Sequence, residues 1–350
     1  MLVHIVTSRE KRKRYRFISE PLAFLGHEVC VTETSSTLEL LSKLISSSKH
    51  RKPDAYILLG VGLRELLTTI YLNHSSIPIV FRLGGDPIKD LADIRVRYLT
   101  ERQYLLVLSV LLREFIARLC LSRIGRAIVV NKSLVAPIAE RMATSGRVAV
   151  SEHFAFGSLI NKSYKVDGRV RLLVVCNLLW SSKAEGVAWL IRQLSSIASS
   201  RSTGLHIEVA GDGPHFGSLV TAVAAMNICE LVEVNFCGYV QNLDELYASA
   251  DIFLYKSEHD ASPNVILEAK RHSMPMLVNR CLQFESLIND EENGFLYTDE
   301  DDFARKLIDL CESEETRRKL GLGAARSFKK DFSLGPASLR LDKSLKLLTS

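Results

Sequence analysis

Residues 207–214 read Ile207-Glu208-Val209-Ala210-Gly211-Asp212-Gly213-Pro214, and this stretch decides the fold. Its apolar first half is typical of a buried strand. The two glycines let the backbone turn sharply, and a proline suits the first turn of a helix. A helical pattern follows, so the stretch predicts a strand, a tight turn and a helix, which is the start of a βαβ unit.

The same alternation of short apolar runs and longer helical patterns continues in both directions along the chain. Continuous apolar runs are typical of parallel strands that are covered on both faces. The sequence therefore predicts an α/β protein with two doubly wound parallel-sheet (Rossmann-like) domains and right-handed crossovers. The predicted strands are 2–7, 28–32, 55–60, 78–83, 127–131 and 147–151 in the first half, and 171–176, 206–211, 232–238, 251–257 and 275–279 in the second.

The length of 350 residues also fits two domains at ~150 residues each. We place the first domain at 1–165 and the second at 166–333, with a junction near 161–168. Residues 334–350 read as an amphipathic helix that follows the second sheet, and we expect it to pack back on the first domain. Because ligands bind beyond the carboxyl ends of parallel strands, the site is expected in a cleft between the domains.

The composition is that of a globular chain, and its charge is unevenly distributed. Hydrophobic residues make up 47% and charged residues 24%, which excludes a disordered chain, and no repeat is present. The net charge of +5 hides 25 Lys and Arg against 14 Asp and Glu in residues 1–165, and 20 against 26 in the remainder. The first half therefore favours contact with negatively charged partners.

The cysteines and the N-terminus indicate a cytoplasmic protein. Seven cysteines are scattered without a Cys-x-x-Cys pair, which is typical of reduced thiols and of neither a disulfide framework nor a zinc site. The chain begins directly with a strand pattern and lacks the layout of a signal peptide. No apolar run approaches the ~20 residues of a membrane-spanning helix. We expect a cytoplasmic chain that is peripheral on a membrane face at most.

Residues 257–269 combine a strand end, a loop and a helix start with two carboxylates. Asp260 lies in the loop, Ser262 suits an N-cap with Pro263 in the first turn, and Glu268 follows along the helix. A helix N-terminus binds phosphate, and flanking carboxylates accept hydrogen bonds from sugar or ribose hydroxyls. Alternatively, Asp260 and Ser262 only cap the helix and Glu268 is solvated. The spacing alone favours this second interpretation.

Several short segments of the second half occur in a fixed order and spacing. These segments are Glu185-Gly186, 211–214, 236–240, 243–251, 260–269, 293–296 and 301–310. Together they resemble the family-4 glycosyltransferases of the GT-B fold. The resemblance covers most of residues 170–335 and is specific as a set, whereas in the first half only 26–29 and 81–86 are similar.

This resemblance implies a retaining transfer of a sugar from a nucleotide diphosphate sugar to an acceptor, with no required metal or cofactor. It assigns Asp260 to the hydroxyls of the donor sugar, Lys183 to the phosphates and Glu268 to the ribose. A fixed cation at Lys183 neutralises charge that develops on the leaving diphosphate, so Asp260 and Lys183 are the catalytic candidates. The other donor-binding candidates are Gly211, Gly213, Tyr239 near the base, and Ala261, Ser262, Pro263, Asn264 and Val265 around the diphosphate.

The sequence departs from the family pattern at three places. The first carboxylate is usually Glu and is Asp260 here, an Arg that commonly partners the Lys is replaced by Asn177-Leu178, and residues 282–284 replace a Gly-rich turn. Two alternatives therefore stay open. One is a non-catalytic relative that binds a nucleotide sugar or serves as a partner subunit. The other is a GT-B epimerase that acts on the nucleotide sugar itself.

A basic run follows the first predicted strand. Residues 9–16 hold six cations, which suit phosphates, anionic lipid headgroups or nucleic acid, or form a solvated helix start. We expect no nucleic acid partner, because no RNA-binding motif or interleaved aromatics follow. The acceptor candidates are Arg9, Lys11, Arg12 and Asp86. Of these, Asp86 follows the end of a predicted strand, and it could equally cap the next helix.

Residues 95–126 place seven arginines around the apolar core 104–112. The core is too short to span a bilayer. A basic helix with this apolar content either lies in a membrane interface or is buried with its arginines at the ends, and the pattern slightly favours burial. Together with the run at 9–16, it nevertheless leads us to expect a glycan or lipid-linked acceptor near an anionic membrane surface.

Overall fold

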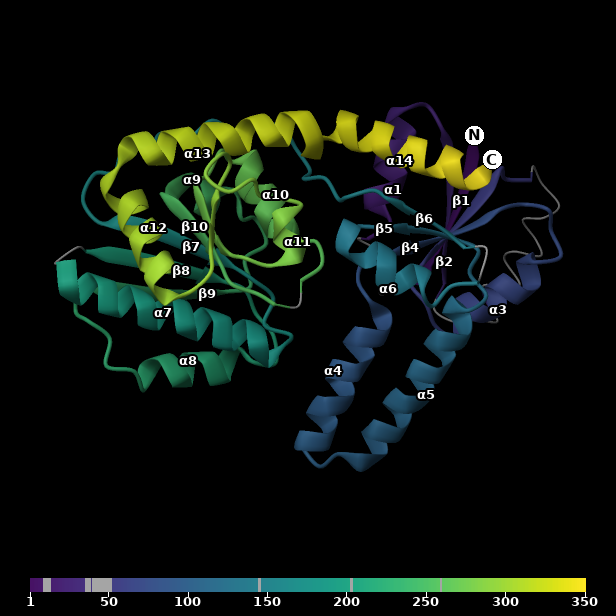
Figure 1. Ribbon diagram of the computed structural model, residues 1–350, viewed down its shortest axis with the longest axis horizontal. Coiled ribbons are helices and arrows are strands. Elements are labelled where there is room, and N and C mark those ends of the chain that lie inside the picture. The colour runs from purple at the N-terminus through teal and green to yellow at the C-terminus, as the bar shows by residue number, and fades with distance from the viewer. Residues whose placement is uncertain (9–13, 35–38, 40–51, 144–145, 202–203, 259) are drawn as a thin grey trace. The chain divides into compact units, whose positions relative to one another are not determined.

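The computed structural model describes the chain except residues 9–13, 35–38, 40–51, 144–145, 202–203 and 259. The chain divides into two compact units (Figure 1). The first is Met1–Phe154 together with Leu334–Ser350, and the second is Ala155–Ser333. The sequence placed the division at residue 165. The structure places it earlier, because the Tyr164 hydroxyl donates to the Ser273 carbonyl (3.0 Å) and the Ser273 hydroxyl donates to the Ile160 carbonyl (2.7 Å).

The first unit is built on a parallel sheet in the order β2-β1-β3-β4-β5-β6. Helix α14 packs on α1 and adds Leu341, Leu345 and Leu348 to the core of this unit. The strands are β1 Leu2–Ser8, β2 Glu28–Thr34, β3 Ala55–Leu59, β4 Ile79–Leu83, β5 Arg126–Val129 and β6 Arg147–Val150. The helices are α1 Arg16–Phe24, α3 Leu63–Leu72, α4 Pro87–Thr100, α5 Tyr104–Leu121, η2 Lys132–Leu134, α6 Val135–Ala139 and α14 Leu334–Thr349.

The second unit is built on a parallel sheet in the order β12-β11-β10-β7-β8-β9. Its strands are β7 Val170–Val175, β8 Leu205–Ala210, β9 Val232–Gly238, β10 Ile252–Tyr255, β11 Met276–Asn279 and β12 Phe295–Tyr297. Its helices are α7 Ser181–Arg201, α8 Phe216–Ala224, α9 Asp244–Ser249, α10 Asn264–Arg271, α11 Leu282–Glu285, α12 Glu300–Glu312, α13 Glu314–Ser327 and the π-helical turn η3 Phe328–Phe332.

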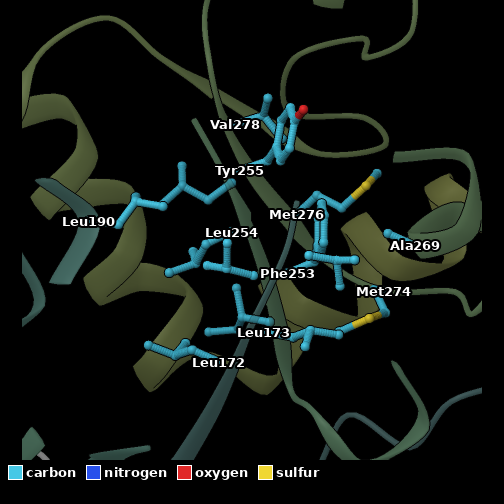
Figure 2. Close-up of a cluster of buried hydrophobic side chains, with 14 of the residues drawn as sticks. Leu172, Leu173, Leu190, Phe253, Leu254, Tyr255, Ala269, Met274, Met276 and Val278 are labelled. Atoms are coloured by element: carbon cyan, nitrogen blue, oxygen red, sulfur yellow. The ribbon is translucent and has the colours of Figure 1, made fainter. Parts of the chain in front are cut away.

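The core of the second unit lies around its central strands. Figure 2 shows Leu172 and Leu173 of β7 among Phe253, Leu254 and Tyr255 of β10. All four residues of β10 are buried, as a strand covered on both faces requires. This packing fixes the carboxyl ends of β7 and β10, from which two loops of the site begin.

The predicted fold class is confirmed by the two parallel six-stranded sheets with flanking helices. Each predicted strand is present, and most of its ends lie within one or two residues of those observed. Strand β12 was missed because its three residues are too few to show a periodic pattern.

Helices α4 and α5 form an antiparallel hairpin that projects from the sheet of the first unit (Figure 1). They meet at Glu101–Gln103, where Arg102 has a positive φ of 57°. The buried side of α5 is centred on Glu114, which Arg95 and Arg118 neutralise at 2.8 and 2.7 Å. The favoured expectation of a buried helix is wrong for the first half of α5, where Leu105 is 83% exposed.

Candidate functional site

Lys183 and Asp260 form an ion pair in the second unit. Lys183 lies in the first turn of α7, and Asp260 lies in the loop after β10. The Lys183 ammonium donates to Asp260 Oδ2 at 2.7 Å, and its side chain is only 6% exposed, against 25% for Asp260. The pair forms because β7 and β10 are neighbours in the sheet, so the residues after them meet at one edge.

Tyr255 supports this ion pair from the end of β10. Its hydroxyl donates to the same Asp260 oxygen at 2.8 Å. Burial and the neighbouring Asp260 raise the pKa of Tyr255 well above its ordinary value, so the hydroxyl keeps its proton. Burial also raises the pKa of the nearby Cys176 thiol to about 11. Two groups beside the ion pair, the Tyr255 hydroxyl and the Cys176 thiol, are therefore neutral.

Glycines bring the loops after β7 and β8 together. Gly211 and Gly213 have φ values of 148° and 154°, in the region that favours glycine. A Cβ on Gly211 would overlap the carbonyl oxygen of Cys176, and one on Gly213 would lie 2.5 Å from the Leu178 carbonyl. These loops therefore pack backbone to backbone beside the start of α7.

Helix α10 begins next to Asp260, one residue later than the sequence predicted. Pro263 is the N-cap residue, with ψ at 114°, and Asn264 is the first residue of the helix. Ser262 is therefore not the cap. Its hydroxyl is buried and, among the described residues, has no hydrogen-bond partner. A buried polar atom without a partner favours binding of an outside ligand at this helix start.

Glu268 lies in the second turn of α10 and is only partly exposed. The hydroxyl of the fully buried Tyr247 lies 3.2 Å from Glu268 Oε2 and equally far from the Val265 carbonyl oxygen. Burial raises the pKa of Glu268, while the Tyr247 hydrogen bond and Arg271 lower it. Tyr247 in turn stacks on His272, with ring centroids 4.8 Å apart. Glu268 is thus held in one orientation by a packed neighbour.

Three of these supporting residues were missed by the sequence prediction. Tyr255 and Tyr247 read as core aromatics, and only the packing shows that their hydroxyls reach carboxylates. Asn279 ends β11 and bonds both the amide and the carbonyl of Ser257, at 2.8 and 3.1 Å, which anchors the loop that carries Asp260. Asn279 could have been noticed in the sequence, because it is a polar residue at the end of a predicted buried strand.

The other second-unit candidates lie at the same sheet edge. Tyr239 directly follows β9 and is 69% exposed. Ala261, Ser262, Pro263, Asn264 and Val265 lie between Asp260 and Glu268, at the start of α10. Because β10, β7, β8 and β9 are adjacent in the sheet, the segments that carry the predicted donor residues follow the carboxyl ends of four neighbouring strands.

The first-unit candidates have a different setting. Asp86 is the N-cap of α4, accepting from the amides of Ile88 (3.0 Å) and Lys89 (3.2 Å), and Arg141 pairs with it at 2.7 Å. Asp86 therefore caps the helix that follows the strand, which is the alternative to a contact with the acceptor. The acceptor candidates Arg9, Lys11 and Arg12 lie outside the described residues. Within the residues that the structure describes, no group of three His, Cys, Asp or Glu is arranged to hold a metal ion.

Comparison with solved structures agrees with the fold. The chain is similar to sucrose-phosphate synthase from Thermosynechococcus elongatus, with a TM-score of 0.70 and 13% identity over 99% of each chain. It is also similar to the Anabaena protein Alr3699/HepE in complex with UDP-glucose, with a TM-score of 0.69 and 13% identity over 99% of this chain and 100% of that one.

Comparison with known sequences concerns mainly the second unit. The chain is 30% identical over 176 residues to N-acetyl-alpha-D-glucosaminyl L-malate synthase from Bacillus anthracis, which is 49% of this chain and 44% of the relative. The match thus spans less than half the length of that relative. Residues 169–313 match the family model of the group 1 glycosyl transferases. This match contains Lys183, Asp260 and Glu268 and lies within the second unit, which is therefore similar to the group 1 glycosyl transferases.

Proposed function

We propose that the chain transfers a sugar from a nucleotide diphosphate sugar to an acceptor, with retention of the anomeric configuration. The observation that carries the proposal is the buried Lys183–Asp260 pair beside the start of α10. A cation, a helix N-terminus and the unpartnered Ser262 hydroxyl converge there, which suits a diphosphate. Retention rests on the resemblance to the family-4 enzymes.

In this proposal each side chain has one task. Lys183 stabilises the negative charge that grows on the diphosphate as the bond to the sugar breaks. Asp260 accepts from hydroxyls of the donor sugar, while Tyr255 and Lys183 fix its orientation. Glu268, held by Tyr247, accepts from the ribose hydroxyls. Tyr239 is exposed and free to approach the base.

UDP-sugars are the first donors to examine, because the similar Anabaena protein was solved with UDP-glucose. A ligand that binds only the folded state at 100 times its Kd stabilises that state by about 2.7 kcal/mol. Thermal melting with UDP-, GDP-, ADP- and TDP-sugars therefore ranks the bases and sugars before any acceptor is known.

We further propose that the first unit holds the acceptor, and that this acceptor is a glycan or a lipid-linked molecule near a membrane. The support is the excess of Lys and Arg in the first half of the sequence, which favours an anionic molecule. Transfer of a labelled sugar to extracted lipids, followed by chromatography, tests this part separately.

Lys183→Ala is the direct test of the donor site. We expect nucleotide release from the donor to fall about 10²-fold or more, because a preorganised charge on the leaving group is lost. Lys306→Ala is a matched control, because Lys306 is also buried and pairs with Asp302 at 3.1 Å, but lies in α12. We expect it to lower stability while kcat stays unchanged.

The remaining outcomes separate the rival functions. Equal losses in the two variants, or turnover of Lys183→Ala at the wild-type rate, would contradict the proposed site. A wild-type chain that binds a donor but never releases nucleotide is a non-catalytic relative. Conversion of the donor sugar in the absence of any acceptor identifies an epimerase.

A further inference from the structure

Helix α5 exposes an apolar stripe that nothing in the described part of the first unit covers. The stripe is defined here as the exposed residues of its first twelve positions that share one face, and it is called the α5 stripe. At about 100° per residue these side chains fall within about 120° of the helix circumference, over a length of about 17 Å. The members and their exposures are Tyr104 64%, Leu105 83%, Leu108 63%, Leu111 41%, Leu112 60% and Phe115 63%.

The opposite side of the helix accounts for the packing of the hairpin. Val107, Val110, Glu114, Ala117 and Leu121 are buried there. They hold α5 to the rest of the first unit without any member of the α5 stripe. A monomer rarely leaves so continuous an apolar surface in water unless the surface binds something.

The charges around the α5 stripe identify the kind of partner. Both acids of residues 95–118 are neutralised within the hairpin, since Glu101 pairs with Arg97 and Glu114 with Arg95 and Arg118. By helical geometry Arg113 and Arg118 lie on the two sides of the stripe, and Arg102 lies at the hairpin turn. The stripe is therefore bordered by arginines, and the two carboxylates of residues 95–118 are both ion-paired.

We infer that the α5 stripe inserts into the interface of an anionic lipid bilayer, with α5 lying flat on the membrane. An amphipathic helix with a basic border and an apolar face of Leu and Phe has this preference. A second copy of the chain is disfavoured, because a two-fold contact would place like-charged arginines together. A tip-first orientation is disfavoured because Glu101 and Arg102 occupy the turn.

A spanning orientation has no support from the helix itself. Within the described residues, no helix combines the length and the apolarity needed to cross a bilayer. The membrane contact goes beyond the proposed transfer reaction, because it requires neither a donor nor turnover. A chain without transferase activity would carry the same stripe.

Vesicle flotation of the full chain tests the inference. We expect the chain to float with vesicles of phosphatidylcholine and phosphatidylglycerol at 7:3, and at least tenfold less with phosphatidylcholine alone. The variant Leu108→Ser/Leu112→Ser/Phe115→Ser should lose at least tenfold in binding. The control Leu322→Ser/Leu339→Ser/Leu347→Ser removes exposed leucines from α13 and α14 and should float like the wild type.

Two further measurements keep the test decisive. A tryptophan placed by Leu108→Trp should be quenched by brominated acyl chains, whereas one placed by Leu339→Trp should not. The inference is overturned if the stripe variant floats like the wild type, or if the wild type ignores anionic vesicles. A wild-type dimer that the stripe variant converts to a monomer, without lipid binding, would assign the stripe to a second copy.

Discussion

Glu268 is a carboxylate whose burial favours the protonated form, whereas its proposed contact with the ribose requires the ionised form. Its raised folded pKa means that its contribution to stability is full below the unfolded pKa of about 4.3 and is lost as the pH rises through the folded value. The neighbouring Tyr247 and Arg271 limit this loss. The residue thus lowers stability at neutral pH, where the proposed contact with ribose hydroxyls requires its ionised form.

The substitution Glu268→Gln should separate the two effects. The amide cannot ionise, so we expect a higher Tm than the wild type at pH 7.5 and no difference at about pH 3.5. Affinity for UDP should fall about tenfold, because a charge-assisted hydrogen bond is lost. Thermal melting across pH and a UDP titration measure both changes.

The exposed Glu245→Gln in α9 is the control for the removal of a carboxylate charge. A lower Tm for Glu268→Gln at both pH values would contradict this account of Glu268. Unchanged affinity for UDP would remove Glu268 from the donor site and leave the account of its burial standing.

At the scale of elements, the close packing of the loops after β7 and β8 depends on Gly211. A side chain there would overlap the Cys176 carbonyl oxygen at an unfavourable φ of 148°. We expect Gly211→Ala to lower the free energy of unfolding by about 3 kcal/mol or more. The control Gly217→Ala lies in α8 with open space around it and should raise that free energy by about 0.5–1 kcal/mol. Urea denaturation of both variants measures these free energies of unfolding. An unchanged free energy of unfolding for Gly211→Ala would contradict the observed loop packing.

The elements were more predictable than the contacts that complete the site. The long buried strands are recognisable as continuous apolar runs, because a strand that is covered on both faces has apolar side chains at nearly every position. Tyr247 and Glu268 are 21 residues apart, and their contact arises only when α9 and α10 pack. The predicted start of α10 is one residue too early. Serine is a residue type that commonly caps helices, so the sequence predicts Ser262 as the N-cap, but Pro263 has the extended backbone of the N-cap residue. The apolar run 104–112 located α5, but a continuous run does not reveal which side of a helix is covered.

At the scale of the molecule, the two units differ in charge and in continuity. The first holds 26 Lys and Arg against 15 Asp and Glu, and the second 19 against 25, so the net charges are +11 and −6. The first unit is also discontinuous, because it needs the α14 segment, while the second is the single segment Ala155–Ser333. The basic character thus belongs to the unit whose residues are proposed to meet the acceptor.

Removal of residues 334–350 should affect the two units unequally. The truncation takes Leu341, Leu345 and Leu348 from the core of the first unit, and each buried leucine is worth about 2–5 kcal/mol. We expect amide hydrogens of β1–β6 to exchange much faster, while those of β7–β12 keep their protection. Hydrogen exchange with mass spectrometry measures both sheets in one sample. Equal loss of protection in both sheets would contradict the assignment of α14 to the first unit.

The place of α14 in the first unit also has a consequence for biosynthesis. A ribosome makes residues 334–350 only after it has made the whole of the second unit. At 5–20 residues per second, the sheet β1–β6 waits about ten seconds or more for the helix that completes its core. During that interval the nascent first unit exposes apolar side chains, so we expect it to depend on chaperones until translation reaches α14.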